Sequence, residues 1–173
     1  MISGAVDTKT EEDKIKIGEG GKTMKKMIAV LVVVGLVVAG AAYAAEKDDA
    51  KALVEKAVAY AGAEGKDKAL AEISKAKGTF DKGEMYVFAY DFKGVVVAHP
   101  KNAKLIGKNL LEVPDNDGKL FRKEIVELAK GKGSGWVDYK YMNPASKKPE
   151  QKTTYIQKAG DIMLFIDELH TII

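Results

Sequence analysis

The sequence has no cysteine among its 173 residues, and it holds only two histidines and one tryptophan. The lack of cysteine excludes disulfide bonds, a thiol nucleophile and every metal site built on cysteine ligands. The sequence also lacks a large excess of charge of one sign, because 28 basic residues stand against 25 acidic ones and the formal net charge is +3. Nucleic-acid-binding domains gather basic residues into stripes. This mild balance, without such a stripe, predicts no nucleic-acid partner.

The usual sequence signatures of enzymes are missing as well. There is no nucleophile elbow and no His-x-x-x-His pair. The motif "DNDG", residues 115–118, resembles the start of a calcium loop, but the bidentate glutamate of such a loop would fall on Val126. We therefore interpret Asp115 and Asp117 as turn and helix-capping residues. The sequence predicts no enzyme, no metal site and no cofactor.

A long apolar run near the N-terminus, "MKKMIAVLVVVGLVVAGAAYAA", has the parts of a secretory signal peptide. Two lysines precede a short apolar stretch, and the sequence Ala-Tyr-Ala at 42–44 fits a cleavage site. We expect residues 24–44 to be removed, which places the chain in the periplasm or outside the cell. The alternative is an uncleaved segment 24–44 that anchors the chain to the inner membrane. Residues 1–23 form a polar leader, and Met24 is a candidate true start.

The remaining sequence alternates between helical and strand periodicity. Helical spacing predicts helices over 46–65 and 66–78, the first capped by Asp48 or Asp49. Period-two alternation predicts strands at 85–90 and 95–99 joined by a turn at 91–94 that includes Gly94, and another at 135–144. A helix over 119–133 lies between them, and a hairpin about residues 160–161 ends the chain. Short connections favour antiparallel pairing, so we expect an α+β fold.

Five segments occur in the order typical of one known family. They are "GTFDKGEMYVFAYDFKGVVVAHP" (78–100), "LIGKNL" (105–110), "DNDGKLF" (115–121), "GSGWVDYKYMNP" (133–144) and "KTTYI" (152–156). Together they resemble a single Cache domain of the sCache_2 type, the extracytoplasmic sensor module of bacterial chemoreceptors and histidine kinases. The resemblance implies a PAS-like fold over residues 45–173. In it a long N-terminal helix packs on a five-stranded antiparallel sheet, and a loop-helix insertion covers the ligand.

The resemblance ends at about residue 162. The tail "DIMLFIDELHTII" is similar to the Walker B segment of AAA+ ATPases, which acts together with a phosphate loop. The nearest candidate loop, "GEGGKT" at 18–23, lacks the required spacing between its glycines. We therefore assign no ATPase activity, and we expect residues 162–166 to form the last strand of a divergent end.

Six residues are candidates for binding a ligand: Tyr86, Phe88, His99, Tyr139, Tyr141 and Lys152. The aromatic residues lie at period two on their strands, which is typical of core positions as well as pocket walls. Buried tyrosine hydroxyls need partners, and a small carboxylate provides acceptors. His99 either holds the turn at Pro100 or lines the pocket mouth, where it would make binding pH-sensitive. The resemblance implies a pocket role for both His99 and Lys152.

Three side chains have interpretations that depend on their burial. Lys152 supplies the positive charge that a desolvated anion requires, or else it is a solvated lysine at a strand edge. Arg122 lies opposite Ile125 on its predicted helix, so we expect it to be exposed. Trp136 has the opposite strand parity to Tyr139, so we expect it in the core.

These features predict an exported sensor domain that binds a small organic molecule, such as an organic acid, and acts in signal transduction or chemotaxis. Its expected partners are the ligand, a separate membrane receptor or kinase, and a second copy through the N-terminal helix. The alternative is a structural or interaction module, soluble in the periplasm or tethered to the membrane, that takes no small ligand.

Overall fold

The computed structural model describes residues 43–142, 146–167, 169 and 170, without the side chains of residues 167, 169 and 170. The leader prediction for residues 1–23 lies outside this range, as does the signal-peptide prediction for 24–44 except at its last two positions. None of the helices in the described part combines the length and apolar character needed to cross a membrane.

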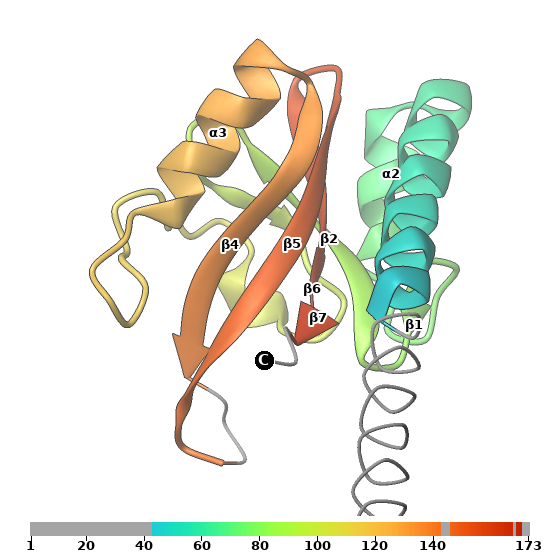
Figure 1. Cartoon of the computed structure of the whole chain (residues 1–173). Coiled ribbons are helices and arrows are strands. Elements are labelled where there is room, and N and C mark those ends of the chain that lie inside the picture. Colours follow the sequence, from blue (N-terminus) through green and yellow to red (C-terminus); the bar gives the residue numbers. More distant parts are fainter. Residues whose placement is uncertain (1–42, 143–145, 168, 171–173) are drawn as a thin grey trace, which may run out of the picture. The chain divides into compact units, whose positions relative to one another are not determined.

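The described chain forms an antiparallel sheet with helices on both faces (Figure 1). An N-terminal helix ends at residue 64. It is followed by α2 (Lys66–Ile73), β1 (Asp81–Lys82), β2 (Met85–Asp91), β3 (Val96–Ala98), the 3-10 turn η1 (Ala103–Leu105), α3 (Phe121–Gly131), β4 (Ser134–Met142), β5 (Pro149–Ala159), β6 (Ile162–Asp167) and β7 (Leu169–His170). The strand order is β1-β2-β6-β5-β4, with β3 beside β2 and β7 beside β5. The predicted α+β fold is confirmed.

Three local predictions need correction, and one is confirmed. The sheet has seven strands rather than five, because the two-residue strands β1 and β7 carry no alternation that a pattern could reveal. Asp48 and Asp49 cap nothing, since the chain is already helical at residue 43. Asp117 does not cap α3 either, because α3 begins at Phe121 with Leu120 as its N-cap residue. Strand β6 does form over 162–166, as expected.

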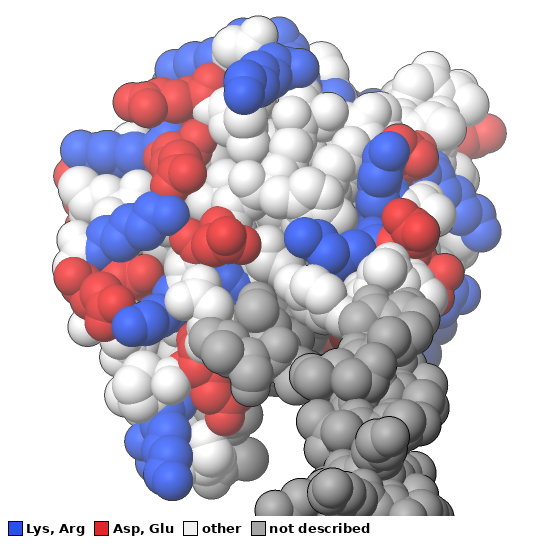
Figure 2. All heavy atoms as spheres, in the orientation of Figure 1, with Lys and Arg blue, Asp and Glu red and all other residues white. Residues whose placement is uncertain are grey.

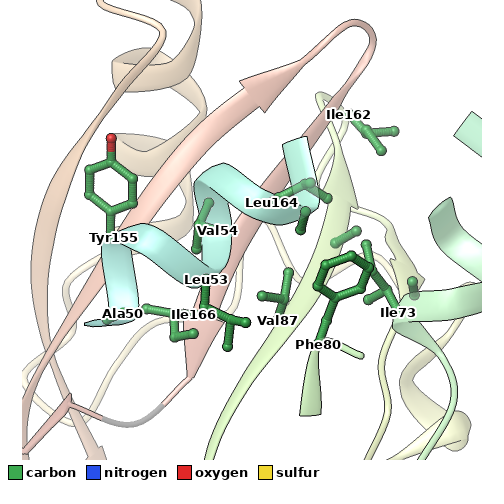
Figure 3. Close-up of a cluster of buried hydrophobic side chains, with 13 residues drawn as sticks. Ala50, Leu53, Val54, Ile73, Phe80, Val87, Tyr155, Ile162, Leu164 and Ile166 are labelled. Atoms are coloured by element: carbon green, nitrogen blue, oxygen red, sulfur yellow. The ribbon is translucent and has the colours of Figure 1, made fainter. Parts of the chain in front are cut away.

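One face of the sheet packs against the N-terminal helix. Its buried residues Ala50, Leu53, Val54 and Ala57 recur at helical spacing, so they form a single apolar stripe. This stripe packs against the inward-facing side chains of β2 and β6, where Val87 and Leu164 are fully buried (Figure 3). Phe80 also belongs to this cluster, and its ring centroid lies 5.5 Å from that of Tyr60. Trp136 packs beside Tyr155 on this same face, as its strand parity predicted.

The other face is covered by α3 and by the segment that joins β3 to α3 (Figure 1). Because successive strand residues point to opposite faces, the neighbours Leu164 and Phe165 belong to different clusters. The charged surface shown in Figure 2 carries lysines interspersed with acidic residues. Several pair at short range, such as Lys119 with Glu124 at 2.7 Å and Lys140 with Asp117 at 2.7 Å.

Candidate functional site

A cavity of about 280 Å³ lies between the sheet and the α3 side of the molecule. Its wall is formed by Phe88, Tyr90, His99, Leu105, Leu110, Val113, Phe121, Arg122, Ile125, Tyr139, Tyr141, Thr154 and Phe165. These residues come from four strands, from α3 and from the connecting segment between β3 and α3. Most of them are apolar or aromatic. The volume is close to the lower end of roughly 300–1,000 Å³ that is common for small-molecule sites.

Strand parity explains why these side chains meet. Phe88 and Tyr90 of β2 share one face with Phe165 of β6, and the three rings lie 4.8–5.5 Å apart, centroid to centroid. In β4, Tyr139 points to this same face and stacks on Phe121 of α3, with centroids 4.3 Å apart and planes at 6°. Edge-to-face and stacked aromatic pairs are favourable geometries for rings. The back wall is therefore rigid and aromatic.

The connecting segment closes the cavity from the side. The backbone N–H of Gly107 donates to the carbonyl of Val96 in β3 over 2.8 Å, and the backbone N–H of Leu110 donates to the carbonyl of Gly94 over 2.9 Å. Gly94 has a φ of 80°, and a Cβ at this position would lie 2.6 Å from Cβ of Leu111. Only glycine allows this close approach. The turn after β2 therefore holds Leu105 and Leu110 against the cavity.

His99 performs both of the roles that the sequence left open. Its Nδ1 accepts the backbone N–H of Lys101 over 3.2 Å and that of Asn102 over 3.1 Å, which holds the turn after Pro100. The buried ring also forms part of the cavity wall, 5.5 Å from the ring of Phe88. Because an N–H can only donate, Nδ1 carries no proton in this arrangement. The neutral ring therefore carries its proton on Nε2.

Arg122 is the only arginine in the sequence, and its predicted exposure is wrong. The side chain is half-buried and lines the cavity. Its Nη1 donates to the carbonyl of Val113 over 3.0 Å, and the guanidinium carbon lies 4.2 Å from the ring centroid of Phe121. Its Nε is shielded from solvent and has no hydrogen-bond partner among the described residues. A buried unpaired donor costs about 1–3 kcal/mol, so such a group at a cavity wall indicates a function.

The predicted site residues divide into two groups. Phe88, His99, Tyr139 and Tyr141 line the cavity, whereas Tyr86 and Lys152 are absent from its wall. The ring of Tyr86 lies 5.4 Å from that of His99, so it supports the wall from behind. Lys152 is buried, and its Nζ lies 5.4 Å from the ring centroid of Tyr141. The ligand-binding roles of these six residues stay predictions.

Several wall residues escaped the sequence analysis. Two of them could have been found from strand parity alone. Tyr90 lies two residues after Phe88 on the same strand, and Phe165 lies in the predicted last strand, 162–166. Arg122 could not be found in this way, since its expected position is on the helix face opposite the apolar residue Ile125. Leu105, Leu110 and Val113 come from irregular segments that have no period, so no pattern could place them.

The turn before α3 fixes the outer edge of the cavity. The Asp115 carboxylate accepts the N–H groups of Asp117 and Lys119 within its own turn and that of Lys140 on edge strand β4, over 2.8–2.9 Å. Burial raises the pKa of Asp115, but these donations outweigh it and hold the pKa below its usual value. Within the described residues, no group of three or more histidine and acidic side chains could hold a metal ion.

The comparison with known protein families resolves what kind of domain this is. A family model for the Cache domain, dCache_2, matches residues 45–166. The chain belongs to the Cache domain family. The family recognised from the sequence is thereby confirmed, and Cache domains as a family are sensory modules.

Solved structures of Cache sensors share this fold. One is described as a periplasmic sensor domain of a chemotaxis protein, with 27% identity and a TM-score of 0.58 over 79% of this chain and 98% of that one. Another is described as a Cache chemosensory domain that recognises carboxylic acids, with 26% identity and a TM-score of 0.60 over 77% of this chain and 98% of that one.

Curated Cache relatives are much longer proteins. A methyl-accepting chemotaxis protein of Pseudomonas putida, McpP, is 35% identical over 72 residues, which is 42% of this chain and 13% of the relative. The sensor histidine kinase MctS of Rhizobium johnstonii is 31% identical over 71 residues, 41% of this chain and 15% of the relative. The matched segments thus span less than a sixth of either relative.

Proposed function

We propose that this Cache domain is an extracytoplasmic sensor that binds a small carboxylic acid in the cavity beneath α3. One observation carries the proposal: Arg122 borders an otherwise apolar and aromatic cavity and holds a buried donor without a partner among the described residues. A desolvated carboxylate requires a cation, and arginine presents a planar fork that fits it. The apolar walls fit the organic remainder of such an acid.

The polar groups of the wall fit the same ligand. Tyr139, Tyr141 and His99 bring hydroxyl and imidazole groups to the cavity, each able to donate to a carboxylate oxygen. Lys152 lies behind Tyr141 and adds positive charge nearby. In this proposal Phe88 contacts the apolar part of the ligand, whereas Tyr86 and Lys152 act from the layer behind the wall.

We propose that the domain signals ligand binding to another protein. Relatives that share this domain are a chemotaxis receptor and a sensor histidine kinase by name, which favours a role in signal transduction. We propose a periplasmic location, reached either after cleavage of residues 24–44 or with that segment as a membrane anchor. Pairing of two copies through the N-terminal helix stays a prediction, and size-exclusion chromatography with light scattering of the full chain would check it.

A thermal-shift screen of the full chain against small carboxylates, amino acids and amines tests the proposed function. We expect carboxylates to raise the unfolding midpoint, because a ligand that binds only the native state stabilises it by mass action. Arg122→Gln should abolish this rise. The matched control is Lys123→Gln, which removes the neighbouring positive charge on α3. Lys123 pairs with Glu112 and does not line the cavity. A chain that responds to no compound and forms a stable dimer would instead be an interaction module.

A further inference from the structure

The turn after β3 is built around the ring of a histidine. His99 Nδ1 accepts the backbone N–H of Lys101 over 3.2 Å and that of Asn102 over 3.1 Å. Asparagine and aspartate hold turns in the same way, with a side-chain oxygen that accepts from the backbone two residues further on. Here an imidazole nitrogen takes the place of that oxygen. The turn therefore depends on an acceptor whose protonation changes within the physiological pH range.

The same turn positions part of the cavity wall. Asn102 is the N-cap residue of η1, where its side chain accepts the N–H of Lys104 over 3.2 Å and its carbonyl accepts that of Leu105 over 3.1 Å. His99 and Leu105, at the two ends of the segment 99–105, both line the cavity. We call this segment the His99 turn. Loss of its hydrogen bonds would open the cavity wall on this side.

Two other sets of contacts hold the neighbouring residues, and neither uses an imidazole. Lys101 Nζ lies 2.6 Å from the buried Asp81 carboxylate, and this ion pair lasts until the acid is protonated. Beyond the turn, the backbone N–H groups of Gly107 and Leu110 donate to carbonyls of β3 and of the turn before it. Such backbone hydrogen bonds do not titrate. Residues 107–110 thus provide an internal reference for the His99 turn.

We infer that protonation of His99 opens the His99 turn, so that this side of the cavity wall opens more readily in acid. An imidazolium carries a hydrogen on both nitrogens and cannot accept an N–H. The donors on Lys101 and Asn102 therefore both lose their acceptor when Nδ1 gains a proton. The inference concerns the free domain and does not depend on which molecule occupies the cavity. It locates the pH response in the turn itself and not in a contact between the ring and a ligand.

The other ionisable groups around the ring titrate outside the range of an imidazole. The charged side chains on the surrounding elements are those of Asp81 in β1, Lys101 in the turn, Arg122 in α3 and Lys152 in β5. The phenols are those of Tyr86 and Tyr90 in β2 and of Tyr139 and Tyr141 in β4. Burial raises the pKa of Asp81, but its ion pair and two backbone donors outweigh burial and hold the pKa below its usual value. Lysine, arginine and tyrosine ordinarily titrate at about pH 10 or above.

Amide hydrogen exchange of the full chain without ligand, followed by NMR from about pH 8 to about pH 5, tests this inference. Each rate is divided by the rate of an unstructured chain at the same pH, which reports local opening. If the open form has the ordinary imidazole pKa of about 6.5, linkage to one proton raises the opening constant roughly thirtyfold over this range. The amides of Lys101, Asn102 and Leu105 should lose protection by about this factor. Those of Gly107 and Leu110 should change by less than about threefold, because their hydrogen bonds do not titrate.

His99→Asn is the decisive variant, because an amide oxygen can accept the same two N–H groups and does not titrate. Protection of the His99 turn should then be independent of pH. The matched control is His170→Asn, which removes the other histidine of the sequence and should keep the roughly thirtyfold change.

Nitrogen-15 NMR of the His99 ring in the unsubstituted chain adds a measurement that needs no variant to fold, and it should show Nδ1 without a proton near pH 8. A proton on Nδ1 at that pH, or equal pH dependence in His99→Asn and the unsubstituted chain, would overturn the inference while leaving the proposed function intact.

Discussion

Two neighbouring residues of β6 summarise the two faces of the sheet. Leu164 and Phe165 are both fully buried, but they point in opposite directions. Leu164 enters an apolar cluster between the sheet and the N-terminal helix. Phe165 forms the floor of a cavity that also contains polar side chains. The same strand thus contributes to packing on one side and to the proposed binding site on the other.

The difference separates the closely packed core of this domain from its proposed binding site. On the helix side the apolar side chains fill the space between two regular elements, so close packing is the main contribution. On the α3 side the rings leave a cavity, and Arg122 keeps a buried donor without a partner among the described residues. Substitutions on the helix side should therefore change the free energy of unfolding, and substitutions at the cavity should change ligand affinity.

The largest effect on stability is expected for Leu164→Ala. Removing a fully buried leucine side chain costs about 2–5 kcal/mol, because apolar contacts are lost and a cavity remains. Urea unfolding of the full chain followed by circular dichroism measures this loss. The control Ile106→Ala removes apolar atoms from a residue that is 41% exposed, and it should change stability by less than about 0.5 kcal/mol. Equal losses in both variants would contradict the contrast between the faces.

Arg122→Gln should have the largest effect on binding. A hydrogen bond to a charged group contributes about 1.5–3 kcal/mol, so the affinity for a carboxylate should fall roughly tenfold to hundredfold. Stability should change little or rise, because the variant removes a half-buried charge whose shielded Nε has no hydrogen-bond partner among the described residues. Titration calorimetry and urea unfolding of the same variant separate the two effects. A large loss of stability with unchanged affinity would assign Arg122 to the core instead.

An intermediate and pH-dependent effect is expected for Asp81→Asn, a substitution in the edge strand β1. The buried Asp81 carboxylate accepts from Lys101 Nζ at 2.6 Å and from the backbone N–H of Lys77 and of Gly83. Burial raises its pKa, but these partners outweigh burial and lower it. A carboxyl whose pKa is lower in the folded state stabilises the fold above its unfolded pKa of about 3.9, and loses this as the pH falls.

Asp81→Asn should therefore cost about 1–3 kcal/mol near neutral pH, and the difference from the unsubstituted chain should shrink below about pH 4. Thermal unfolding at a series of pH values from about 7 down to about 3, which spans the ordinary pKa of an aspartate, measures this difference. Asp161→Asn is a suitable control because its ion pair with Lys66 is exposed to solvent, and exposed pairs contribute little. A deficit of constant size at every pH would mean that the charge of Asp81 does not matter.

The smallest effect is expected for Thr153→Val on the helix side. Thr153 is buried, and its Oγ1 has no hydrogen-bond partner among the described residues. Replacing the hydroxyl with a methyl group of similar size should leave stability unchanged or raise it by up to about 1 kcal/mol. In the adjacent residue, Thr154 Oγ1 donates to the carbonyl of Ile166 over 2.6 Å, so Thr154→Val should be destabilising. A reversed order of these two variants would contradict the assignment.

Much of the fold could be predicted because its elements repeat regularly. The alternation of residues 85–90 places Phe88 and Tyr90 on one face, and the structure places both rings at the cavity. The turn with Gly94 was also recognisable, although the close approach of Leu111 that makes glycine necessary was not. Periodicity reports which face a residue occupies, and it does not report what lies opposite that face.

The site was less predictable for the same reason. His99 carried two interpretations, and both describe the structure, because one ring can hold a turn and line a cavity at once. Arg122 was misplaced because its long side chain is held by Val113, a residue in a segment without periodicity. Lys152 has the strand parity of the cavity face, but it lies outside the wall that the described residues form.

The most direct test of a carboxylate sensor is a calorimetric titration of the full chain with hexanoate, repeated for Arg122→Gln and for the control Lys123→Gln. The geometry of the cavity predicts saturable binding to the unsubstituted chain and to Lys123→Gln, and at least a tenfold loss in Arg122→Gln with an unchanged unfolding midpoint. Equal affinity in all three proteins would contradict the role of Arg122, and the absence of binding to the unsubstituted chain would contradict the sensor itself.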